Sequence, residues 1–469
     1  MYNKKSHIHF VGIGGIGMSG IATILKYQGY TISGCDKDLD QQTIQHLKSI
    51  GCTIYEGNNT AACNDPSIDT LVYSSAIKAD DPEIIAAQIR GIPTIPRALM
   101  LAELMRTKYS IAIAGAHGKT TTTSLISHIM LEAKLDPTII IGGHLKTIST
   151  NAYLGNGDFL VAEADESDRS LLHLNSTLAV VTNIDLEHLE TYRDLEDIKQ
   201  TFSHFLSNLP FYGKAILCID DENIQSILPI PHIKAIKYGI QNKKQADIYA
   251  QNIDLQPDHS DFEVWHRNNK KPLGTTRLSM PGEHNILNAL AAITLALDLG
   301  VPFNQISSAL ESFKGIERRF TFKGSFDGVE IFDDYGHHPR EIANTLIVAK
   351  KRTKKGLIVV FQPHRYTRTA KLWDHFVNLF ASNPIDHLII TDVYPASENP
   401  IEGINSKKLI EAIKHKNPNL SLAYAPFEPH FASIKKTLEN HVSNGDLLLL
   451  QGAGRVNNLA RELLQENSF

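Results

Sequence analysis

Residues 111–120, Ile-Ala-Ile-Ala-Gly-Ala-His-Gly-Lys-Thr, decide the fold of the middle of this chain. The four apolar residues predict a buried strand, and a helical pattern follows the glycine-rich turn. A strand that enters a glycine turn and then a helix N-terminus directs backbone N–H groups and the helix dipole at an anion. We therefore predict a loop that binds the phosphates of a nucleoside triphosphate. Its candidate residues are Gly115, Ala116, His117, Gly118, Lys119, Thr120 and Thr121.

The chemistry of this loop follows from two side chains. Lys119 can bridge the terminal phosphates, and the Thr120 hydroxyl can bind Mg²⁺. The spacing G-x-x-x-x-G-K-[ST] requires glycine where this chain has Ile113, so only a shorter G-x-x-G-K-T pattern is present. The alternative is a plain glycine turn that caps a threonine-rich helix, which leaves the lysine followed by four threonines unexplained.

A second glycine loop lies near the N-terminus. An expected strand at 7–11 precedes Gly12, Gly14 and Gly17, which fit the pattern G-x-G-x-x-G. A further expected strand at 30–36 ends in Asp36, at about the distance where a Rossmann unit contacts a ribose. The pattern places a diphosphate on a helix N-terminus but leaves NAD, FAD, a sugar nucleotide or a purely structural turn open.

Length and composition limit the remaining possibilities. The chain has 469 residues, 42% of them hydrophobic and 21% charged, which is ordinary globular usage and enough for two to four domains. A net charge of −5 argues against a general nucleic-acid binder. No apolar run approaches the roughly 20 residues that span a bilayer, so we expect no membrane insertion and a cytoplasmic location. The four cysteines form no C-x-x-C pair and are expected to be reduced.

Apolar strand patterns alternate with helical patterns along most of the chain, which predicts α/β domains on mainly parallel sheets. Three blocks can be separated, at 1–107, 108–317 and 318–469. In the last block, strands are expected at 356–361, 387–391 and 446–450, each followed by a loop and a helix.

The middle block carries acids where a bound triphosphate would need them. An apolar strand that starts at Phe159 runs into Glu163 and further acids up to Asp168, and a second strand at 178–182 leads to His188. Because parallel strands end at the same edge of a sheet, these groups are expected to meet. Carboxylates at such an edge can hold Mg²⁺, and His188 is a candidate second metal ligand.

The last block has two clusters of ligating groups, at 333–339 and 361–369. Their arginines can form paired hydrogen bonds with carboxylates or phosphates. A site that brings a triphosphate, a carboxylate and an amino acid together needs such fixed donors to offset charge repulsion. A zinc site built from His337, His338 and His364 is a minor alternative, and so are ordinary loop histidines.

Together these motifs resemble the Mur ligase family of cell-wall synthesis, over essentially the whole chain. The motifs that carry the resemblance lie at 12–22, 115–123, 163–174, 183–192, 281–292, 333–341, 361–369, 392–396 and 400–403. The resemblance implies three domains: a Rossmann-like N-terminal domain for a UDP substrate, a central P-loop ATPase-like domain, and a Rossmann-like C-terminal domain that closes with the amino acid. It also implies that ATP phosphorylates the carboxylate of UDP-N-acetylmuramate, and that L-alanine attacks the acyl phosphate in peptidoglycan precursor synthesis.

The resemblance assigns roles to residues of this sequence. In the UDP site it implies Gly14, Gly15, Ile16, Gly17, Ser19, Asp36, Ser74 and Ser75. For ATP it adds His284, Asn288 and Arg319, with Arg318 as an alternative to Arg319, to the loop residues from Gly115 to Thr121. For the metal, Mg²⁺ with Mn²⁺ as a substitute, it implies Thr120, Glu163 and His188. For the amino acid and acyl phosphate it implies Tyr335, His337, His364, Arg365 and Arg368. Lys119, His188, His337 and Arg365 are the expected catalytic residues.

Two departures from the family and several alternatives accompany this reading. Ala116 stands where relatives often have threonine, and Lys199 is only a weak candidate for the carbamylated lysine that some members use. Paralogues add other amino acids or a whole tripeptide, and the segment from Ser397 to Pro400 lacks the Asp-Asn-Pro-Arg signature of diaminopimelate addition. A non-catalytic nucleotide-binding protein and an NAD-dependent oxidoreductase are the rival classes. A monomer or weak homodimer is expected.

Overall fold

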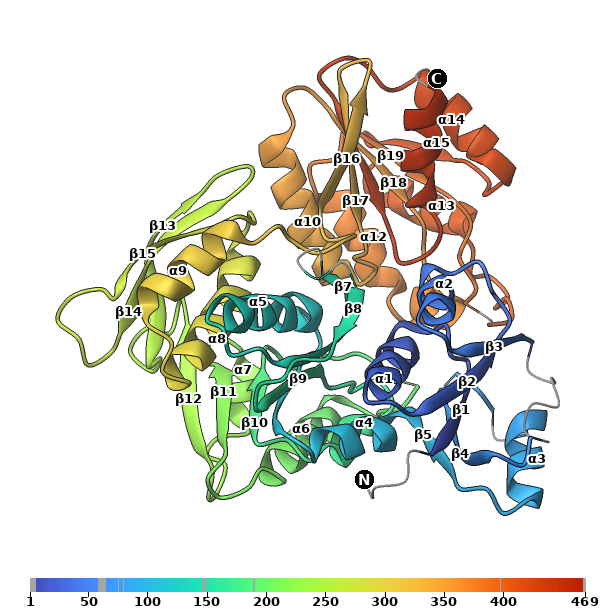
Figure 1. The fold of residues 1–469 in the computed structure, drawn as a ribbon. Helices are drawn as coiled ribbons and strands as arrows, with labels where there is room; N and C mark the ends of the chain where they lie inside the picture. Colours follow the sequence, from blue (N-terminus) through green and yellow to red (C-terminus); the bar gives the residue numbers. More distant parts are fainter. Residues whose placement is uncertain are drawn as a thin grey trace. The chain divides into compact units, whose positions relative to one another are not determined.

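The computed structural model describes residues 6–57, 65–74, 76–78, 80–145, 148, 150–188, 190–396 and 398–466 (Figure 1). The chain divides into two compact units. The first contains residues 1–254, 260–279 and 283–314, and the second contains 255–259, 280–282 and 315–469. The first unit holds two sheets and the second holds one. Each unit is described in turn.

The N-terminal sheet of the first unit is parallel throughout, with the strand order of a Rossmann half. Its strands, in sheet order, are β3 (Thr53–Glu56), β2 (Thr31–Asp36), β1 (His7–Val11), β4 (Ile68–Tyr73) and β5 (Thr94–Pro96). Its helices are α1 (Ile16–Tyr27), α2 (Gln42–Ser49), α3 (Pro82–Ile89) and α4 (Arg97–Met105). The glycine loop lies between β1 and α1, at the carboxyl edge of the sheet.

The second sheet of this unit is larger and mixed. Its strands, in sheet order, are β15 (Gly274–Leu278), β14 (Ser260–His266), β13 (Ile248–Leu255), β12 (Lys234–Gly239), β11 (Lys214–Cys218), β10 (Leu178–Val181), β6 (Tyr109–Ala114), β9 (Phe159–Glu163), β7 (Thr138–Leu145) and β8 (Thr150–Tyr153). The run from β13 to β7 is parallel, and antiparallel pairs close both ends. This central sheet therefore has one common carboxyl edge, where β6, β9 and β10 all end.

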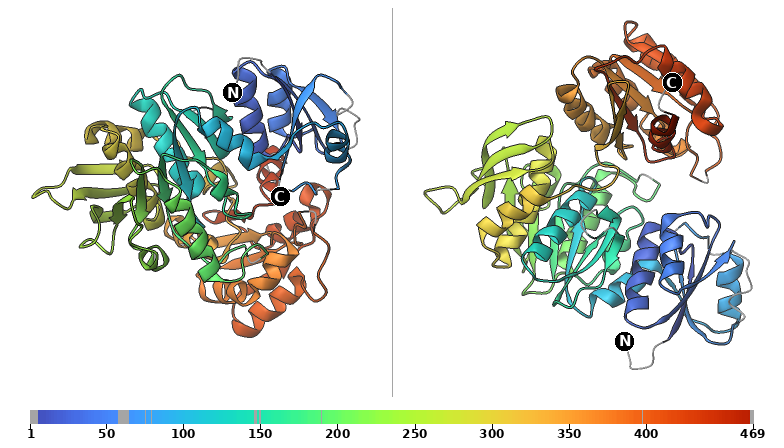
Figure 2. Two further views of the ribbon diagram at one scale, coloured as in Figure 1. Left: turned by 90° about the horizontal axis from the view of Figure 1, so that it is seen from below. Right: turned by 45° about the horizontal axis from the view of Figure 1, so that its top comes forward.

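Helices connect the strands of the central sheet or follow them. They are α5 (Lys119–Glu132), the 3₁₀ turn η2 (Ser170–His173), α6 (Leu195–Ser207), α7 (Glu222–Ser226), α8 (Glu283–Asp298) and α9 (Phe303–Ser312). Helix α5 packs against α8 and α9, and α1 of the N-terminal sheet packs against β7 and β8 (Figures 1 and 2). A Cβ at Gly20 would be in van der Waals contact with Ile140, Asn151 and Ala152, which shows how closely α1 approaches these two strands.

The second unit is a doubly wound domain with one mixed sheet. Its strands, in sheet order, are β16 (Thr321–Phe326), β17 (Val329–Asp334), β21 (Leu447–Gln451), β18 (Leu357–Phe361), β19 (His387–Ile390) and β20 (Ser421–Tyr424). Only β16 runs antiparallel to its neighbour among these described strands. Its helices are α10 (Pro339–Arg352), α11 (Tyr366–Lys371), α12 (Trp373–Ser382), α13 (Ser406–Lys416), the 3₁₀ turn η3 (Pro429–Phe431), α14 (Ala432–Glu439) and α15 (Asn458–Glu466).

Strand β21 shows why this sheet needs helices on both faces. Leu447 and Leu449 pack into a core with α10, α12 and α13, whereas Leu448 and Leu450 pack into a second core with α14 and α15. Successive side chains of a strand point to opposite faces, so an unbroken run of leucines is stable only when both faces are covered.

The sequence-based fold class is confirmed. The predicted strands at 7–11, 30–36, 356–361, 387–391 and 446–450 correspond to β1, β2, β18, β19 and β21 within one residue at each end. None of the helices in the described part of the chain combines the length and apolar character that crossing a bilayer requires.

Candidate active site

The backbone of the phosphate loop requires both of its glycines. Gly115 and Gly118 have φ values of 134° and 81°, a region that side chains with a Cβ rarely adopt. A Cβ at Gly115 would also overlap the Thr182 hydroxyl, and one at Gly118 would overlap the Asn288 amide. The loop therefore lies tightly between the strand end after β10 and helix α8, and the first N–H groups of α5 remain available for an anion.

Lys119 is held at the centre of this loop. Its Nζ donates to the carbonyls of Gly115 (2.6 Å) and Ala116 (3.2 Å) and to Oε1 of Glu166 (2.8 Å). Burial opposes the charged ammonium, but Glu166, Glu187 and Asp165 outweigh burial and keep the pKa of Lys119 above its ordinary value. The lysine is thus a fixed cation at the position predicted for terminal phosphates.

Thr120 and Glu163 are hydrogen-bonded to each other at the carboxyl edge of the central sheet. Glu163 ends β9, and the strand register sets it beside Ile113 of β6, just before the loop. The Thr120 hydroxyl donates to Oε2 of Glu163 at 3.2 Å, while Oε1 accepts the Gly142 N–H at 2.8 Å. Hydroxyl and carboxylate oxygens are the donors that Mg²⁺ prefers, so the pair fits the predicted metal role.

A cluster of candidate metal ligands contains Glu166, Glu187 and His188, whose potential ligand atoms lie within 4.8 Å of one another. His188 Nε2 is 3.4 Å from both carboxylates. Burial lowers the pKa of His188, but hydrogen bonds to Glu166 and Glu190 and the charges of Glu166 and Glu187 raise it to about 9. Oε2 of Glu166 is buried and has no hydrogen-bond partner among the described residues. An orphaned carboxylate oxygen in an acidic cluster fits a divalent cation.

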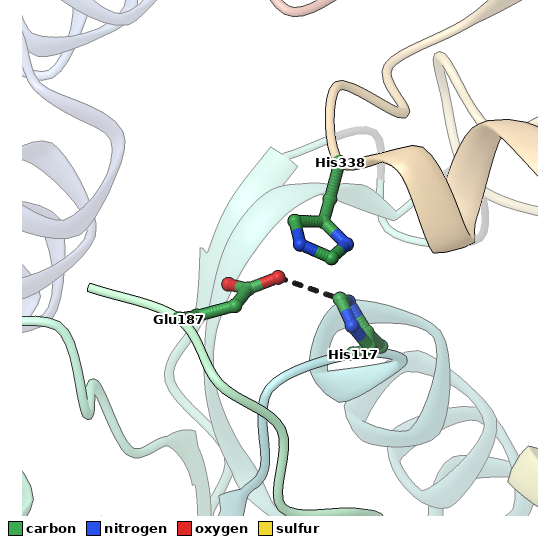
Figure 3. Close-up of side chains that lie close together, drawn as sticks. All are labelled: His117, Glu187 and His338. Atoms are coloured by element: carbon green, nitrogen blue, oxygen red, sulfur yellow. Dashed lines mark ion pairs between the residues drawn. The ribbon is translucent and has the colours of Figure 1, made fainter. Parts of the chain in front are cut away.

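His117 connects the phosphate loop to the end of β10. Its N–H donates to Oδ1 of Asn183 at 2.8 Å, and its carbonyl accepts from Asn183 Nδ2 and from the Thr182 hydroxyl. Nε2 lies 3.1 Å from Asp185, and Nδ1 lies 3.4 Å from Glu187, as Figure 3 shows for the second contact. The loop and the acids that follow β10 are therefore one connected assembly.

The predicted ATP residues on α8 lie on the other side of the loop. Oδ1 of Asn288 accepts from the Thr122 hydroxyl at 3.2 Å, and its side chain contacts the Gly118 turn. His284 lies in the first turn of the same helix and is partly buried. The structure thus joins Asn288 directly to the phosphate loop.

The predicted UDP residues gather around the N-terminal glycine loop. The Gly14 N–H donates to Oδ2 of Asp36 at 2.8 Å, so the acid that ends β2 supports the loop itself. Gly15 caps α1 without a side chain, and Ile16 and Gly17 form its first turn. Ser19 is buried, and its hydroxyl bonds the Ile16 carbonyl and Asn151. The Ser74 hydroxyl accepts the Ala76 N–H. Ser75 lies outside the described residues.

In the second unit, two arginines lie against the ring of Tyr335. The guanidinium carbons of Arg318 and Arg319 lie 4.9 and 5.5 Å from the centre of the Tyr335 ring. Arg318 also donates to the carbonyls of Gly452 (2.8 Å) and Gly454 (3.2 Å), whereas Arg319 is 3.8 Å from Glu341. Arg318 is therefore anchored within its own domain, whereas Arg319 makes a longer ion pair with Glu341.

His337 and His364 lie together near these arginines. Their ring centres are 5.8 Å apart, and His364 also stacks on Tyr394 at 5.4 Å. Burial lowers the pKa of His337 to about 3 and that of His364 to about 4, helped in both by Arg368. Both imidazoles are neutral at physiological pH. His338 instead caps α10, and among the described residues these three histidines do not bring their nitrogens together as a zinc site would require.

Arg365 and Arg368 stand at the start of α11. Arg368 Nη1 lies 3.2 Å from Nδ1 of His364, and Arg365 has a φ of 70° with its N–H bonded to the Tyr394 carbonyl. Nε of Arg365 is buried and has no hydrogen-bond partner among the described residues. Glu398 accepts from the Thr367 N–H (3.0 Å) and hydroxyl (2.7 Å) and so fixes the first turn of this helix.

Sequence reasoning missed several residues of the candidate sites in the two units. Glu166, Glu187 and Asn183 were part of the acidic runs, but no role was given to them individually. Their position shortly after the predicted strands was the available signal. Glu398 had no sequence signal, because its partner Thr367 is 31 residues away.

Comparisons with known proteins agree along the whole chain. Three family models match it: "Mur ligase family, catalytic domain" at residues 7–109, "Mur ligase middle domain" at 113–296 and "Mur ligase, glutamate ligase domain" at 318–454. A UDP-N-acetylmuramate--L-alanine ligase from Desulforapulum autotrophicum is 48% identical over 466 residues, 99% of each chain. One from Syntrophus aciditrophicus is 46% identical over 464 residues, 99% of this chain and 94% of the relative.

Solved structures give the same result. A UDP-N-acetylmuramate-alanine ligase from Thermotoga maritima superposes with a TM-score of 0.81 at 26% identity and covers 98% of both chains. A murein peptide ligase from Psychrobacter arcticus, also 26% identical with 98% coverage of both chains, has a TM-score of 0.73.

Proposed function

The chain belongs to the Mur ligase family, and we propose that it joins L-alanine to the carboxylate of UDP-N-acetylmuramate with conversion of ATP to ADP and phosphate. The observation that carries this proposal is the meeting of three strand ends, where the phosphate loop after β6 contacts the acids that follow β9 and β10. Full-length relatives that share 46–48% of its residues bear the name of this reaction.

The three matched regions support a division of labour. We propose that residues 1–107 bind the UDP substrate, that 108–317 bind ATP and metal, and that 318–469 supply the amino-acid site. The N-terminal glycine loop then serves uridine diphosphate instead of NAD, with Gly14, Gly15, Ile16 and Gly17 nearest to the phosphates.

The first chemical step is transfer of the γ-phosphoryl group to the sugar carboxylate, because a free carboxylate is a poor electrophile. Such a transfer depends mainly on positioning and charge neutralisation. Lys119 supplies a fixed cation for the terminal phosphates, and the N–H groups at the start of α5 orient them. When bound, Mg²⁺ supplies further neutralisation of the phosphate charge. Thr120 with Glu163, and His188 with Glu166 and Glu187, are the groups that would hold the metal ions.

The second step is attack of the L-alanine amine on the acyl phosphate. Arg365 and Arg368 provide cationic donors for the amino-acid carboxylate and the acyl phosphate. The neutral imidazoles of His337 and His364 can take part in hydrogen bonds without adding charge to an arginine-rich site. Exclusion of water protects the acyl phosphate from hydrolysis.

Phosphate release from Mg·ATP with UDP-N-acetylmuramate present tests the proposal. Release that requires L-alanine, with a coupled rise of UDP-N-acetylmuramoyl-L-alanine, supports it. Release that requires glutamate, diaminopimelate or the tripeptide L-Ala-γ-D-Glu-meso-diaminopimelate would assign the chain to another branch of the family. Absence of release with every acceptor would favour a non-catalytic nucleotide-binding role.

A further inference from the structure

Arg97 stands where the two sheets of the first unit meet. It is the first residue of α4, and its side chain is only 16% exposed. A Cβ on Gly17 would lie 3.3 Å from Cδ and 3.4 Å from Nη1 of Arg97, so the guanidinium lies directly on the first turn of α1. A side chain at position 17 would make a tight contact with Arg97.

The same guanidinium reaches the acidic loop of the phosphate site. Nη2 donates to Oδ2 of Asp165 at 3.2 Å, and Oδ1 of Asp165 accepts the Ser167 N–H at 3.0 Å. Asp165 directly precedes Glu166, the carboxylate partner of Lys119. One side chain therefore contacts both the glycine loop and the segment that positions the catalytic lysine.

Arg97 has N–H donors that none of the described residues accepts. A guanidinium carries five N–H donors, and Asp165 is its one hydrogen-bond partner among the described residues. The first turn of α1 has no acidic residue and no side-chain cap, so its N–H groups are available to an anion as well. A mostly buried arginine with spare donors beside such a helix start matches a diphosphate.

Hydrogen bonds fix α1 of the N-terminal sheet to β8 of the central sheet. Asn151 of β8 donates to the Ile16 carbonyl (2.6 Å) and to the Ser19 hydroxyl (3.0 Å) of α1. The distance from the glycine loop to the acidic loop is therefore fixed by the fold, and Arg97 can serve both without a large movement.

We propose that Arg97 binds the diphosphate of the nucleotide-sugar substrate and, through Asp165, positions the acidic loop beside Lys119. This inference rests on the proposed function, since it assigns the diphosphate to the N-terminal glycine loop. Binding of the UDP substrate then fixes one side of the site at which its own carboxylate is phosphorylated.

Calorimetric binding of UDP and of uridine to Arg97→Met tests the contact with the diphosphate. Loss of charged hydrogen bonds predicts at least about tenfold weaker binding of UDP and of UDP-N-acetylmuramate, with uridine binding unchanged. Arg97→Lys should recover part of the affinity. Arg106→Met is the matched control, because Arg106 follows the same helix and pairs only with the exposed Glu103 among the described residues. It should bind UDP as the unmodified chain does.

Asp165→Asn tests whether Arg97 positions the acidic loop through Asp165. This variant should change UDP affinity by no more than about twofold and should lower kcat. In a chain that also carries Arg97→Met, Asp165→Asn should have little further effect on kcat, because the two groups act through one contact. Unchanged UDP affinity in Arg97→Met, or an equal loss of UDP and uridine binding, would overturn the proposal. If the unmodified chain showed no alanine-dependent phosphate release, the proposed function would fail instead, while the UDP measurements would still judge Arg97.

Discussion

Nζ of Lys119 lies 2.8 Å from Oε1 of Glu166, which is itself within 3.4 Å of His188 Nε2. The lysine of the phosphate loop and the predicted metal-binding histidine therefore share one carboxylate. This connection explains why a loop on β6 and two acidic segments, after β9 and β10, must be considered a single site. It also makes Lys119 and Glu166 energetically dependent on each other.

Lys119→Ala is expected to abolish turnover and to leave UDP-N-acetylmuramate binding intact, since the lysine lies in the central sheet. Removal of one preorganised cation should lower kcat by about 10²–10³ or more. Because the buried Glu166 would lose its lysine partner, Glu166→Gln in the same chain should restore part of the lost thermal stability but not the activity. Turnover at the normal rate in Lys119→Ala would contradict the phosphate-loop assignment.

Glu163→Gln should raise the Mg²⁺ concentration that gives half-maximal activity, because an amide is a weaker ligand than a carboxylate. Thr120→Val should act in the same direction, whereas Thr120→Ser keeps the hydroxyl and is the control. Activity measured over a Mg²⁺ titration distinguishes these cases. An unchanged Mg²⁺ requirement in both Glu163→Gln and Thr120→Val would remove this pair from the metal site.

Gly115→Ala should disrupt the phosphate loop far more than Gly57→Ala disrupts its turn. Both positions have positive φ, but a Cβ at Gly57 would meet nothing within 4 Å, whereas one at Gly115 would overlap the Thr182 hydroxyl. Conformational strain alone costs about 1–2 kcal/mol, and the overlap at Gly115 adds about 1–3 kcal/mol. Urea denaturation and ATP binding measure both effects, and equal behaviour of the two variants would show that the loop can relax.

Glu398→Gln is expected to raise the KM for L-alanine several-fold with little change in the KM for UDP-N-acetylmuramate. Glu398 holds the first turn of α11 through Thr367, and Arg365 and Arg368 flank that residue. Glu402→Gln, an exposed change in the same loop, is the control and should be silent. If both KM values rose equally, Glu398 would have only a general stabilising role.

His9 should make the N-terminal sheet sensitive to acid. Burial lowers the pKa of His9 to about 4, from an ordinary value of 6.5. His9 binds a proton more readily in the unfolded chain than in the folded one. The contribution of His9 to the free energy of unfolding is therefore complete above pH 6.5 and is lost as the pH falls toward 4. The shift corresponds to about 3 kcal/mol. His9→Asn should flatten urea-unfolding stability between pH 7 and pH 4.5, and an unaltered pH profile would contradict this reading.

The sequence by itself determined the elements and their chemistry. Apolar runs that end at Ala114 and Glu163 predict strands, because a parallel strand covered on both faces must be apolar along its length. The glycines at 115 and 118 predict the phosphate loop, because only a residue without a Cβ adopts their backbone angles without strain. These are local properties, and the strands and loops were found where the sequence predicted them.

Only the tertiary structure decided which side chains meet. Strand register set Glu163 beside the loop, and chain crossover brought Glu166, Glu187 and Lys119 together from three different segments. The Arg97 contact with Asp165 joins residues 68 positions apart, and the Glu398 contact with Thr367 spans 31. Such contacts leave no periodic pattern, because their energy depends on distances that the folded sheets create and the local sequence does not encode.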